Sequence, residues 1–495
     1  MSNNPVTEPQ KFAGDLFWVA ASNLTIPLVG LITLPALTKN YPAATYAAWI
    51  QSVFVVWLIS FVLNLGLGNA MVRFLAAEDD IIVRRRSIGI MLWPTLAFSC
   101  LIILSSVFFR QDISKILFAT SDYAYLVPLI FVWAATEAVF SLLISYLLAR
   151  RSIKRMSIIQ LSLTIFKMAV IVIMAVMGCN LEWIMCGTVV GVTIFATIVL
   201  IMIVKEIGWP WPAMAGLKGY MAFSIPLMPG GILFWAISVS DRYFITNLLN
   251  LSQAGVYSAS FSICTLMSVF YSPIQVALFP VLSRLWEQKQ ESKVRNYLEY
   301  SNKLFLTLAI PGAAGLCILS QQLLGILSTP DYMAGGGLVL LITLAIILSG
   351  LFHINVFVIL LVQQTKWLMP IIAAAAVVNI GVNLALIPIF GIIGAAIASV
   401  MSYLILAVIV IAWARKVISY NIGILFLAKV IIGASLMAFC ISFIHVSGIF
   451  GIVAVAVAGV IIFSLWMWLA RAFSTEDWKL IKEIIMGLRQ GALLR

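Results

Sequence analysis

A glutamate lies in the middle of one of the most apolar stretches of the sequence. Glu137 belongs to the run FVWAATEAVFSLLISYLLARR, thirteen residues before Arg150, and Lys167 lies twelve residues after Arg155 in the next apolar run. If both runs are helices joined by the basic loop between them, each charge lies roughly 18–20 Å from the same membrane face. A lone charge at that depth is costly, and an opposite charge or a hydrated cavity relieves the cost. We therefore expect Glu137 and Lys167 to point into one helical bundle and to interact.

This predicted pair has two interpretations, and the sequence leaves both open. In the functional one, Glu137 carries a coupling proton or cation and Lys167 contacts an anionic ligand. In the structural one, the two side chains only neutralise each other. No cofactor is expected, and coupling to H⁺ or Na⁺ stays open.

Further charged residues fall near the ends of apolar runs. Asp241 and Arg242 lie near an outer end, where an arginine can extend its head group to the interface. Asp15 and Arg73 both lie near the cytoplasmic face on neighbouring runs, as a gate pair or as an interfacial pair. Arg284 ends a later run in the way that Arg73 ends an earlier one.

The stretch SIPLMPGGILF interrupts a further apolar run. Proline lacks a backbone N–H, and proline and glycine both interrupt helices within membranes. We interpret this cluster as a hinge, with an inert kink as the alternative. Its residues are Pro226, Pro229, Gly230 and Gly231.

The composition indicates which elements must position these side chains. Of the 495 residues, 63% are hydrophobic and 10% are charged, whereas soluble domains contain about 25% charged residues. A helix needs about 20 apolar residues to cross a bilayer. We therefore predict an all-α polytopic membrane protein with about fourteen transmembrane helices. Their predicted ranges are 13–37, 45–69, 88–109, 123–148, 157–177, 182–204, 219–245, 253–283, 304–325, 337–363, 367–387, 391–413, 421–447 and 449–470.

The distribution of basic residues predicts the orientation. With the N-terminus in the cytoplasm, twenty-four of the thirty Lys and Arg residues fall on inner segments and three on outer ones. Cytoplasmic segments carry such an excess, so we expect both termini to be cytoplasmic. The expected location is the cytoplasmic (inner) membrane. The net charge of +12 then reflects topology and does not indicate nucleic acid. Residues 1–12 form a polar cytoplasmic segment, and 474–495 are expected to form an amphipathic helix on the inner surface.

Matching positions recur at an offset of 209–213 residues. Arg73 and Arg284 differ by 211 positions, and Tyr46 and Tyr257 differ by the same number. An even number of spans separates the copies, so they are expected to be parallel six-helix repeats around a central cavity. The predicted N-lobe is 13–205, the inter-lobe linker 206–218 and the C-lobe 219–413. The two helices of 421–470 are an addition to the duplication.

Several chemistries find no support in the sequence. It shows no nucleotide-binding loop, no cluster of metal ligands and no nucleophile constellation. The six cysteines lie almost wholly in apolar runs without paired spacing, so we interpret them as packing residues. An enzyme is therefore not expected.

Three stretches resemble a known family. VNIGVNLALIPIFGIIGAAIASVMSYLI (378–405) resembles a pattern of the MOP transporter superfamily, carried by Asn379, Asn383, Pro388, Gly391, Gly394, Ala395 and Ala396. SDRYFITNLLNLSQAGVYSASFSI (240–263) and TYAAWIQSVFVVWLISFVLNLGLGNAMVRFLA (45–76) resemble the polysaccharide-export branch, which includes the Wzx-type flippases of lipid-linked oligosaccharides. The first pattern also occurs in MATE drug exporters, and therefore indicates fold more than cargo.

The resemblance implies a function and a substrate. It implies a flippase that moves a polyprenyl-(pyro)phosphate-linked oligosaccharide from the inner to the outer leaflet by alternating access, for O-antigen-like surface polysaccharide. An undecaprenyl-pyrophosphate-type glycan, membrane lipids and the polysaccharide polymerase machinery are the implied partners. The head group is anionic, so the cavity is expected to be positive. The cations assigned to it are Lys167, Arg242, Arg73 and Arg284, and the acids assigned to coupling or ion pairs are Glu137, Asp241 and Asp15.

Two alternatives remain. A MATE-like, cation-coupled drug antiporter would place acids in its cavity, whereas the charges here are mixed. A polysaccharide polymerase or ligase would need a long external loop, and the longest outer connection, 110–122, has about a dozen residues.

Overall fold

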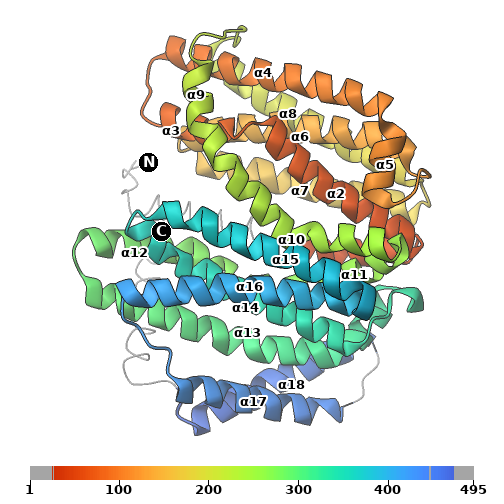
Figure 1. Ribbon diagram of the computed structural model, residues 1–495, viewed down its shortest axis with the longest axis vertical. Coiled ribbons are helices and arrows are strands. Elements are labelled where there is room, and N and C mark those ends of the chain that lie inside the picture. The colour runs from red at the N-terminus through yellow and green to blue at the C-terminus, as the bar shows by residue number, and fades with distance from the viewer. Residues whose placement is uncertain (1–24, 26, 445–447, 473–495) are drawn as a thin grey trace, which may run out of the picture. The chain divides into compact units, whose positions relative to one another are not determined.

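The computed structural model describes residues 25, 27–444 and 448–472, which are helical apart from short connections (Figure 1). Thirteen helical segments in this part of the chain are long and apolar enough to cross a membrane, and no strand occurs in it. The predicted all-α, multi-pass fold is confirmed. The thirteen segments are Ala43–Leu63, Ile81–Phe108, Ala124–Ala149, Ile153–Val176, Leu181–Ile207, Leu217–Leu248, Leu251–Glu287, Glu291–Leu327, Gly336–Leu361, Thr365–Phe390, Ile392–Val417, Ile424–Ser442 and Gly448–Leu469.

The first predicted span, 13–37, is only partly described by the structure. Its second half forms the apolar helix Pro27–Thr38. The start of the span, with Asp15, lies outside the described residues, and so do segment 1–12 and the tail 474–495.

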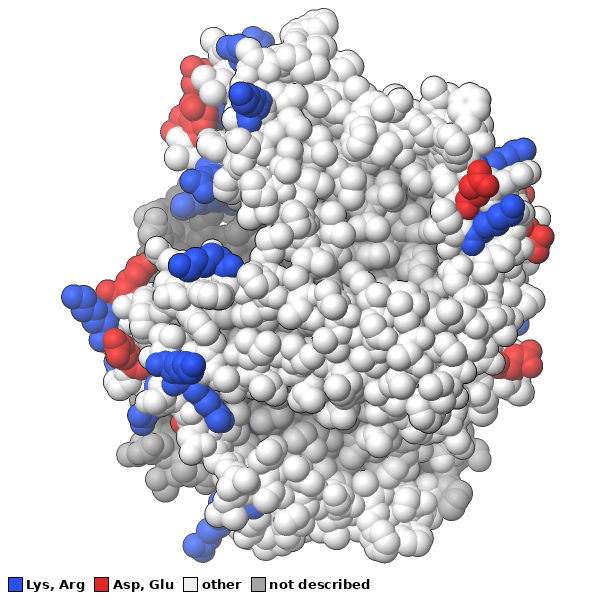
Figure 2. Space-filling model, in the orientation of Figure 1, with Lys and Arg blue, Asp and Glu red and all other residues white. Residues whose placement is uncertain are grey.

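Charged side chains are confined to particular parts of the surface. On the face drawn in Figure 2, they gather at helix ends, and the flanks between those ends are uncharged. A lipid-facing flank must lack charge because hydrocarbon cannot solvate it. This pattern is typical of a protein that crosses a membrane.

By its internal contacts the chain divides into two compact units. The amino-terminal unit comprises 28–259 and 372–398, and the carboxy-terminal unit comprises the described residues of 1–27, 260–371 and 399–495. Three helices contribute to both units, namely α11 (Leu251–Cys264), α15 (Leu368–Phe390) and α16 (Ile392–Val417). The predicted lobes, their boundaries and their parallel duplication stay predictions.

Helix α6 (Val127–Ala149) is the centre of the amino-terminal unit. It packs against α2 (Ala43–Leu63), α3 (Leu67–Leu75), α4 (Ile81–Phe108) and α8 (Leu181–Ile207). Small buried side chains along α6 permit this, because they let neighbouring backbones approach closely in lipid. They include Ala134, Ala135 and Ala138.

Charged and phenolic side chains join three of these helices at one end. Arg84 at the start of α4 is bonded at 2.8 Å to Glu206 near the end of α8, and the Tyr146 hydroxyl of α6 donates to the same carboxylate at 3.0 Å. The arginine is 5% exposed. Pairing and hydrogen bonding offset the cost of burying it.

Two short helices, α3 and α5 (Arg110–Phe118), lie between the long helices, where no separate helix was predicted from the sequence. Leu65 and Gly66, both at positive φ, separate α2 from α3, and α5 lies within the predicted outer loop. The connection between α4 and α6 ends in the 3₁₀ turn η1 (Ala124–Leu126). The helix that follows α6, α7 (Ile153–Val176), packs against α8 and α6.

The predicted hinge coincides with a break in the helix. α9 (Leu217–Ser224) passes through the 3₁₀ turn η2 (Ile225–Leu227) into α10 (Met228–Leu248). The interruption at the prolines is confirmed, and its role as a hinge stays a prediction. A methyl group added to Gly231 would lie 2.6 Å from the Phe61 ring, whereas one added to Gly230 meets nothing within 4 Å.

Helix α13 (Glu291–Leu327) is the centre of the carboxy-terminal unit. It packs against α12 (Ser272–Glu287), α14 (Gly336–Leu361), α17 (Ile424–Ser442) and α18 (Gly448–Leu469). The last two helices also pack on each other, where Gly433 makes room for Trp466. Short 3₁₀ turns complete this unit at Thr265–Phe270 (η3), Pro330–Tyr332 (η4) and Thr365–Trp367 (η5).

Candidate transport site

The carboxylate of Asp241 lies at the centre of a buried polar cluster in the amino-terminal unit. It accepts hydrogen bonds from the Tyr257 hydroxyl and from the Asn383 amide, each at 2.9 Å, and from the Asn379 amide at 3.5 Å. The Asn379 oxygen in turn accepts from Ser240 at 2.9 Å and from Asn383 at 3.0 Å. Asp241 is 1% exposed, and both asparagines are fully buried. We call these five residues the Asp241 cluster.

Helical geometry explains why these side chains meet. Asn379 and Asn383 are four residues apart on α15, so both amides lie on one face of that helix. Tyr257 is on α11, and Asp241 is on α10. In the sequence, Asn379 and Asn383 were noted only as part of the family pattern, and Tyr257 only as part of the internal repeat. None of the three was predicted as a site residue. The N-x-x-x-N spacing was the signal, because two amides on one apolar helix face need polar partners.

One oxygen of the cluster has no hydrogen-bond partner among the described residues. It is Oδ1 of Asn383, whose amide nitrogen is bonded to Asp241 and Asn379. A buried amide oxygen normally accepts a hydrogen bond or binds a cation. The oxygen therefore makes the cluster a candidate site for a proton or a small hard cation. In the described part of the chain, no three His, Cys, Asp or Glu side chains gather as a metal site.

The adjacent residue, Arg242, is enclosed by aromatic rings. Its guanidinium carbon lies 4.8 Å from the centroid of Phe54 and 5.5 Å from that of Tyr257. The Arg242 carbonyl accepts from Gln51 at 3.3 Å, and Gln51 also donates to Thr246. Cation–π contacts of this kind stabilise a desolvated guanidinium by about 2 kcal/mol.

The expectation that Arg242 extends to the membrane interface was wrong. The residue is 1% exposed, and so is Asp241. The rings of Phe54 and Tyr257 hold the guanidinium inside the unit. Position in the sequence alone could not show this, because both rings come from other helices.

Glu137 and Lys167 form the ion pair that their spacing predicted. The Lys167 ammonium donates to Oε1 of Glu137, and the Trp133 indole donates to the same oxygen at 3.4 Å. The Glu137 side chain is 21% exposed and the Lys167 side chain is 23% exposed. The pairing is confirmed, while coupling at Glu137 and ligand contact at Lys167 stay predictions.

The other predicted cations lie on exposed helix ends. Arg73 is exposed near the end of α3, with its guanidinium 4.5 Å from the Phe223 centroid. Arg284 is exposed on α12, in the carboxy-terminal unit. That these two, with Lys167 and Arg242, line one positive cavity stays a prediction.

A family model described as "Polysaccharide biosynthesis protein" matches residues 48–334, more than half of the chain. The chain belongs to this family.

Two curated relatives come from Haloferax volcanii. The probable low-salt glycan biosynthesis flippase Agl15 is 22% identical over 187 residues, which cover 38% of this chain and 39% of the relative. The probable flippase AglR is 26% identical over 174 residues, covering 34% of this chain and 35% of the relative. The matches thus span well under half the length of either relative.

Solved structures show the same fold. The lipid II flippase MurJ, in an inward closed conformation, is 13% identical with a TM-score of 0.76, covering 91% of this chain and 98% of MurJ. An inward-facing MATE multidrug-resistance transporter of the MOP superfamily is 12% identical with a TM-score of 0.62, covering 81% of this chain and 98% of that one. The predicted resemblance to the polysaccharide-export branch is confirmed by the family match. The solved structures, at identities this low, show that the chain shares the fold of MOP-superfamily transporters.

Proposed function

We propose that this family member is a flippase for a lipid-linked oligosaccharide. The observation that carries the proposal is the family match over 48–334, supported by two relatives named as probable flippases, one of them for glycan biosynthesis. In finer detail, the substrate is a polyprenyl-(pyro)phosphate-linked glycan of the undecaprenyl type, moved from the inner to the outer leaflet for O-antigen-like polysaccharide. The chain supplies a path and no covalent chemistry, so it is not an enzyme.

The path requires alternating access. Its proposed hinge is the α9–η2–α10 break with Pro226, Pro229, Gly230 and Gly231. The proposed head-group contacts are Arg242, Arg73 and Arg284, because a phosphate-bearing head group needs cationic partners. Lys167 was also predicted as a head-group contact, but its pairing with Glu137 favours the structural interpretation. Both termini face the cytoplasm in this proposal, and the polymerase machinery uses the exported glycan.

The Asp241 cluster is the proposed coupling site. A carboxylate oxygen and the amide oxygen of Asn383 suit Na⁺, and a proton on Asp241 could instead donate to that amide oxygen. Binding there would change the hydrogen bonds that join α10, α11 and α15. A cation gradient could drive a conformational change in this way, because it would favour one arrangement of those helices.

Deletion of the gene tests the proposed function. We expect lipid-linked oligosaccharide to accumulate in the inner leaflet, with restoration by the wild-type gene, and mass spectrometry of extracted lipids would identify the glycan. The MATE-like antiporter alternative makes a different prediction. It would be supported by unchanged glycolipids together with increased sensitivity to cationic drugs, and that result would overturn the flippase.

A further inference from the structure

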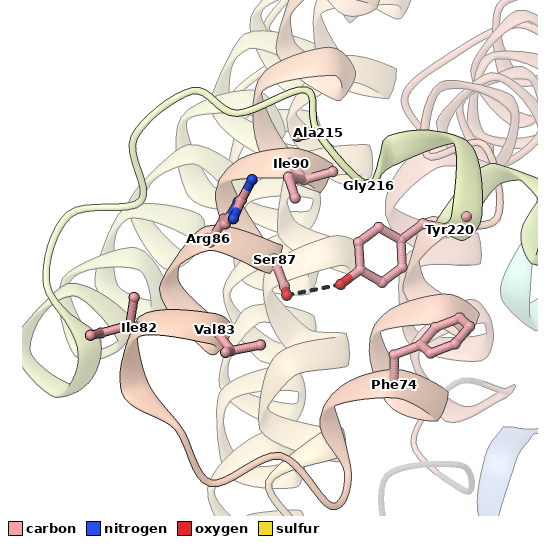
Figure 3. Close-up of a pocket in the computed structure, with 10 residues that line it drawn as sticks. Phe74, Ile82, Val83, Arg86, Ser87, Ile90, Ala215, Gly216 and Tyr220 are labelled. Carbon is pink, nitrogen blue, oxygen red and sulfur yellow. Dashed lines mark hydrogen bonds between the residues drawn. The ribbon is translucent and has the colours of Figure 1, made fainter.

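A pocket separate from the Asp241 cluster opens between the first turns of α4 and the start of α9 (Figure 3). Its volume is about 600 Å³, and all of its lining residues belong to the amino-terminal unit. The walls are mostly apolar, with Phe74 from α3 and Ile82, Val83 and Ile90 from α4. Ile82 and Val83 are 65% and 41% exposed, so the pocket edge presents apolar side chains to its surroundings.

The polar groups of this pocket are few. The hydroxyls of Ser87 and Tyr220 are 2.9 Å apart and face each other across it (Figure 3). One hydroxyl donates to the other, which leaves the second hydrogen for a ligand. Arg86 lines the pocket, and it has no ion-pair partner in the described part of the chain, whereas Arg84 on the same helix is bonded to Glu206. The lining of the pocket therefore includes both an unneutralised cation and a hydroxyl pair.

This combination selects one class of ligand. Apolar walls do not suit an oligosaccharide, whose hydroxyls would lose their hydrogen bonds to water. A free inorganic anion would leave the apolar walls unused. A phosphate attached to hydrocarbon satisfies both parts, since its charge suits Arg86 and its chain covers Ile82 and Val83.

We propose that the α3–α4–α9 pocket binds an anionic phospholipid of the surrounding membrane. Its phosphate lies at Arg86 and the Ser87–Tyr220 hydroxyls, and the first part of an acyl chain lies along the apolar wall. The predicted topology places the start of α4 on the cytoplasmic side, where anionic lipids attract basic side chains. This proposal does not depend on the proposed flippase function.

Two variants with matched controls test the site. Arg86→Gln removes the cation, and its control is Arg155→Gln, an exposed arginine in the first turn of α7. Gly219→Phe is intended to fill the pocket, because Gly219 lines it and a Cβ atom added there meets nothing within 4 Å. Its control is Gly337→Phe, at a glycine in the first turn of α14 with equally open space.

The measurement is native mass spectrometry of purified protein equilibrated with equal amounts of phosphatidylglycerol and phosphatidylcholine. Wild-type protein and both controls are expected to retain phosphatidylglycerol preferentially. Arg86→Gln should weaken that retention about fivefold, which corresponds to about 1 kcal/mol for one basic residue near a charged lipid surface. Gly219→Phe should abolish it. If Gly219→Phe fails to fold, the comparison of Arg86→Gln with Arg155→Gln decides the question.

Three results would overturn the proposal. They are equal retention of the two lipids by wild-type protein, the same loss in a control as in its test variant, and displacement of the lipid by millimolar inorganic phosphate. The last result would mean that the pocket binds a free anion.

Discussion

Glu137 and Asp241 are both carboxylates on membrane-spanning helices of the amino-terminal unit, but their surroundings differ. Glu137 is about one-fifth exposed and bonded to the ammonium of Lys167. Asp241 is 1% exposed and accepts hydrogen bonds from a phenol and two amides. The first carboxylate is partly exposed and paired with an ammonium, and the second is buried within a network of amide and hydroxyl groups.

The difference indicates which site is better suited to a mobile ion. A Glu–Lys pair is neutral as a unit, so an arriving cation must compete with a covalently held ammonium. Amide groups can rotate to present an oxygen instead of a nitrogen, and the oxygen of Asn383 is already without a partner among the described residues. We therefore assign coupling to Asp241 and a structural role to the Glu137–Lys167 pair, and the following experiments test that division.

The largest effect is expected from Asp241→Asn, which keeps the volume of the side chain and removes its charge. Loss of charge-assisted hydrogen bonds costs about 1.5–3 kcal/mol, equivalent to a roughly tenfold to hundredfold loss of cation affinity. Flipping by proteoliposomes that contain equal amounts of reconstituted protein should lose its response to a Na⁺ or pH gradient. Asp112→Asn, at an exposed acid of α5, is the control. An unchanged gradient response would remove Asp241 from the coupling site.

A smaller effect is expected from breaking the ion pair. Glu137→Gln leaves the Lys167 ammonium without its carboxylate, which should cost roughly 1–3 kcal/mol, between the values for exposed and buried pairs. The loss would be seen as lower membrane abundance and a lower thermal midpoint. The double variant Glu137→Gln with Lys167→Met should recover most of the abundance and glycan export.

The double variant separates the two interpretations of the pair. A folded but inactive protein would move coupling back to Glu137. Normal abundance and export in Glu137→Gln alone would contradict both interpretations, because the two side chains would then not depend on each other.

The smallest effect is expected from Arg242→Lys, which keeps the charge but loses the planar group that lies over Phe54 and Tyr257. Such contacts contribute about 0.5–2 kcal/mol, and lysine cannot reproduce the stacking. Thermal stability should fall modestly while the gradient response remains, with Arg155→Lys as control. Loss of the gradient response would place Arg242 in the coupling group with Asp241.

Most of the fold could be predicted because the bilayer imposes a simple rule. Each span must be long and apolar, and the rule found thirteen segments able to cross a membrane and the helical second half of a fourteenth. Local chemistry also predicted the break at η2 from its prolines. The turn η3 within the next segment was missed, although Pro273 follows it at the start of α12.

The site was predicted less completely, for a geometric reason. Equal distance from a shared loop paired Glu137 with Lys167 on consecutive helices. Asp241 binds groups up to 142 positions away, and hydropathy contains no information about which helices pack together. Arg242 was misplaced for the same reason, because the rings that enclose it are on α2 and α11.

The turn between α15 and α16 has a consequence for tracing the ancestry of these transporters. Gly391 adopts φ +60°, and a methyl group at Gly394 would lie 2.4 Å from the Leu386 carbonyl. A larger residue would be strained at the positive φ of Gly391 and would clash with backbone atoms at Gly394, whatever the chain carries. The two glycines are thus explained by the geometry of the helix turn and carry no information about cargo. Divergence between exporters of different cargo should be sought at positions with room to vary, such as Gly219 and Gly230, where an added Cβ atom meets nothing within 4 Å.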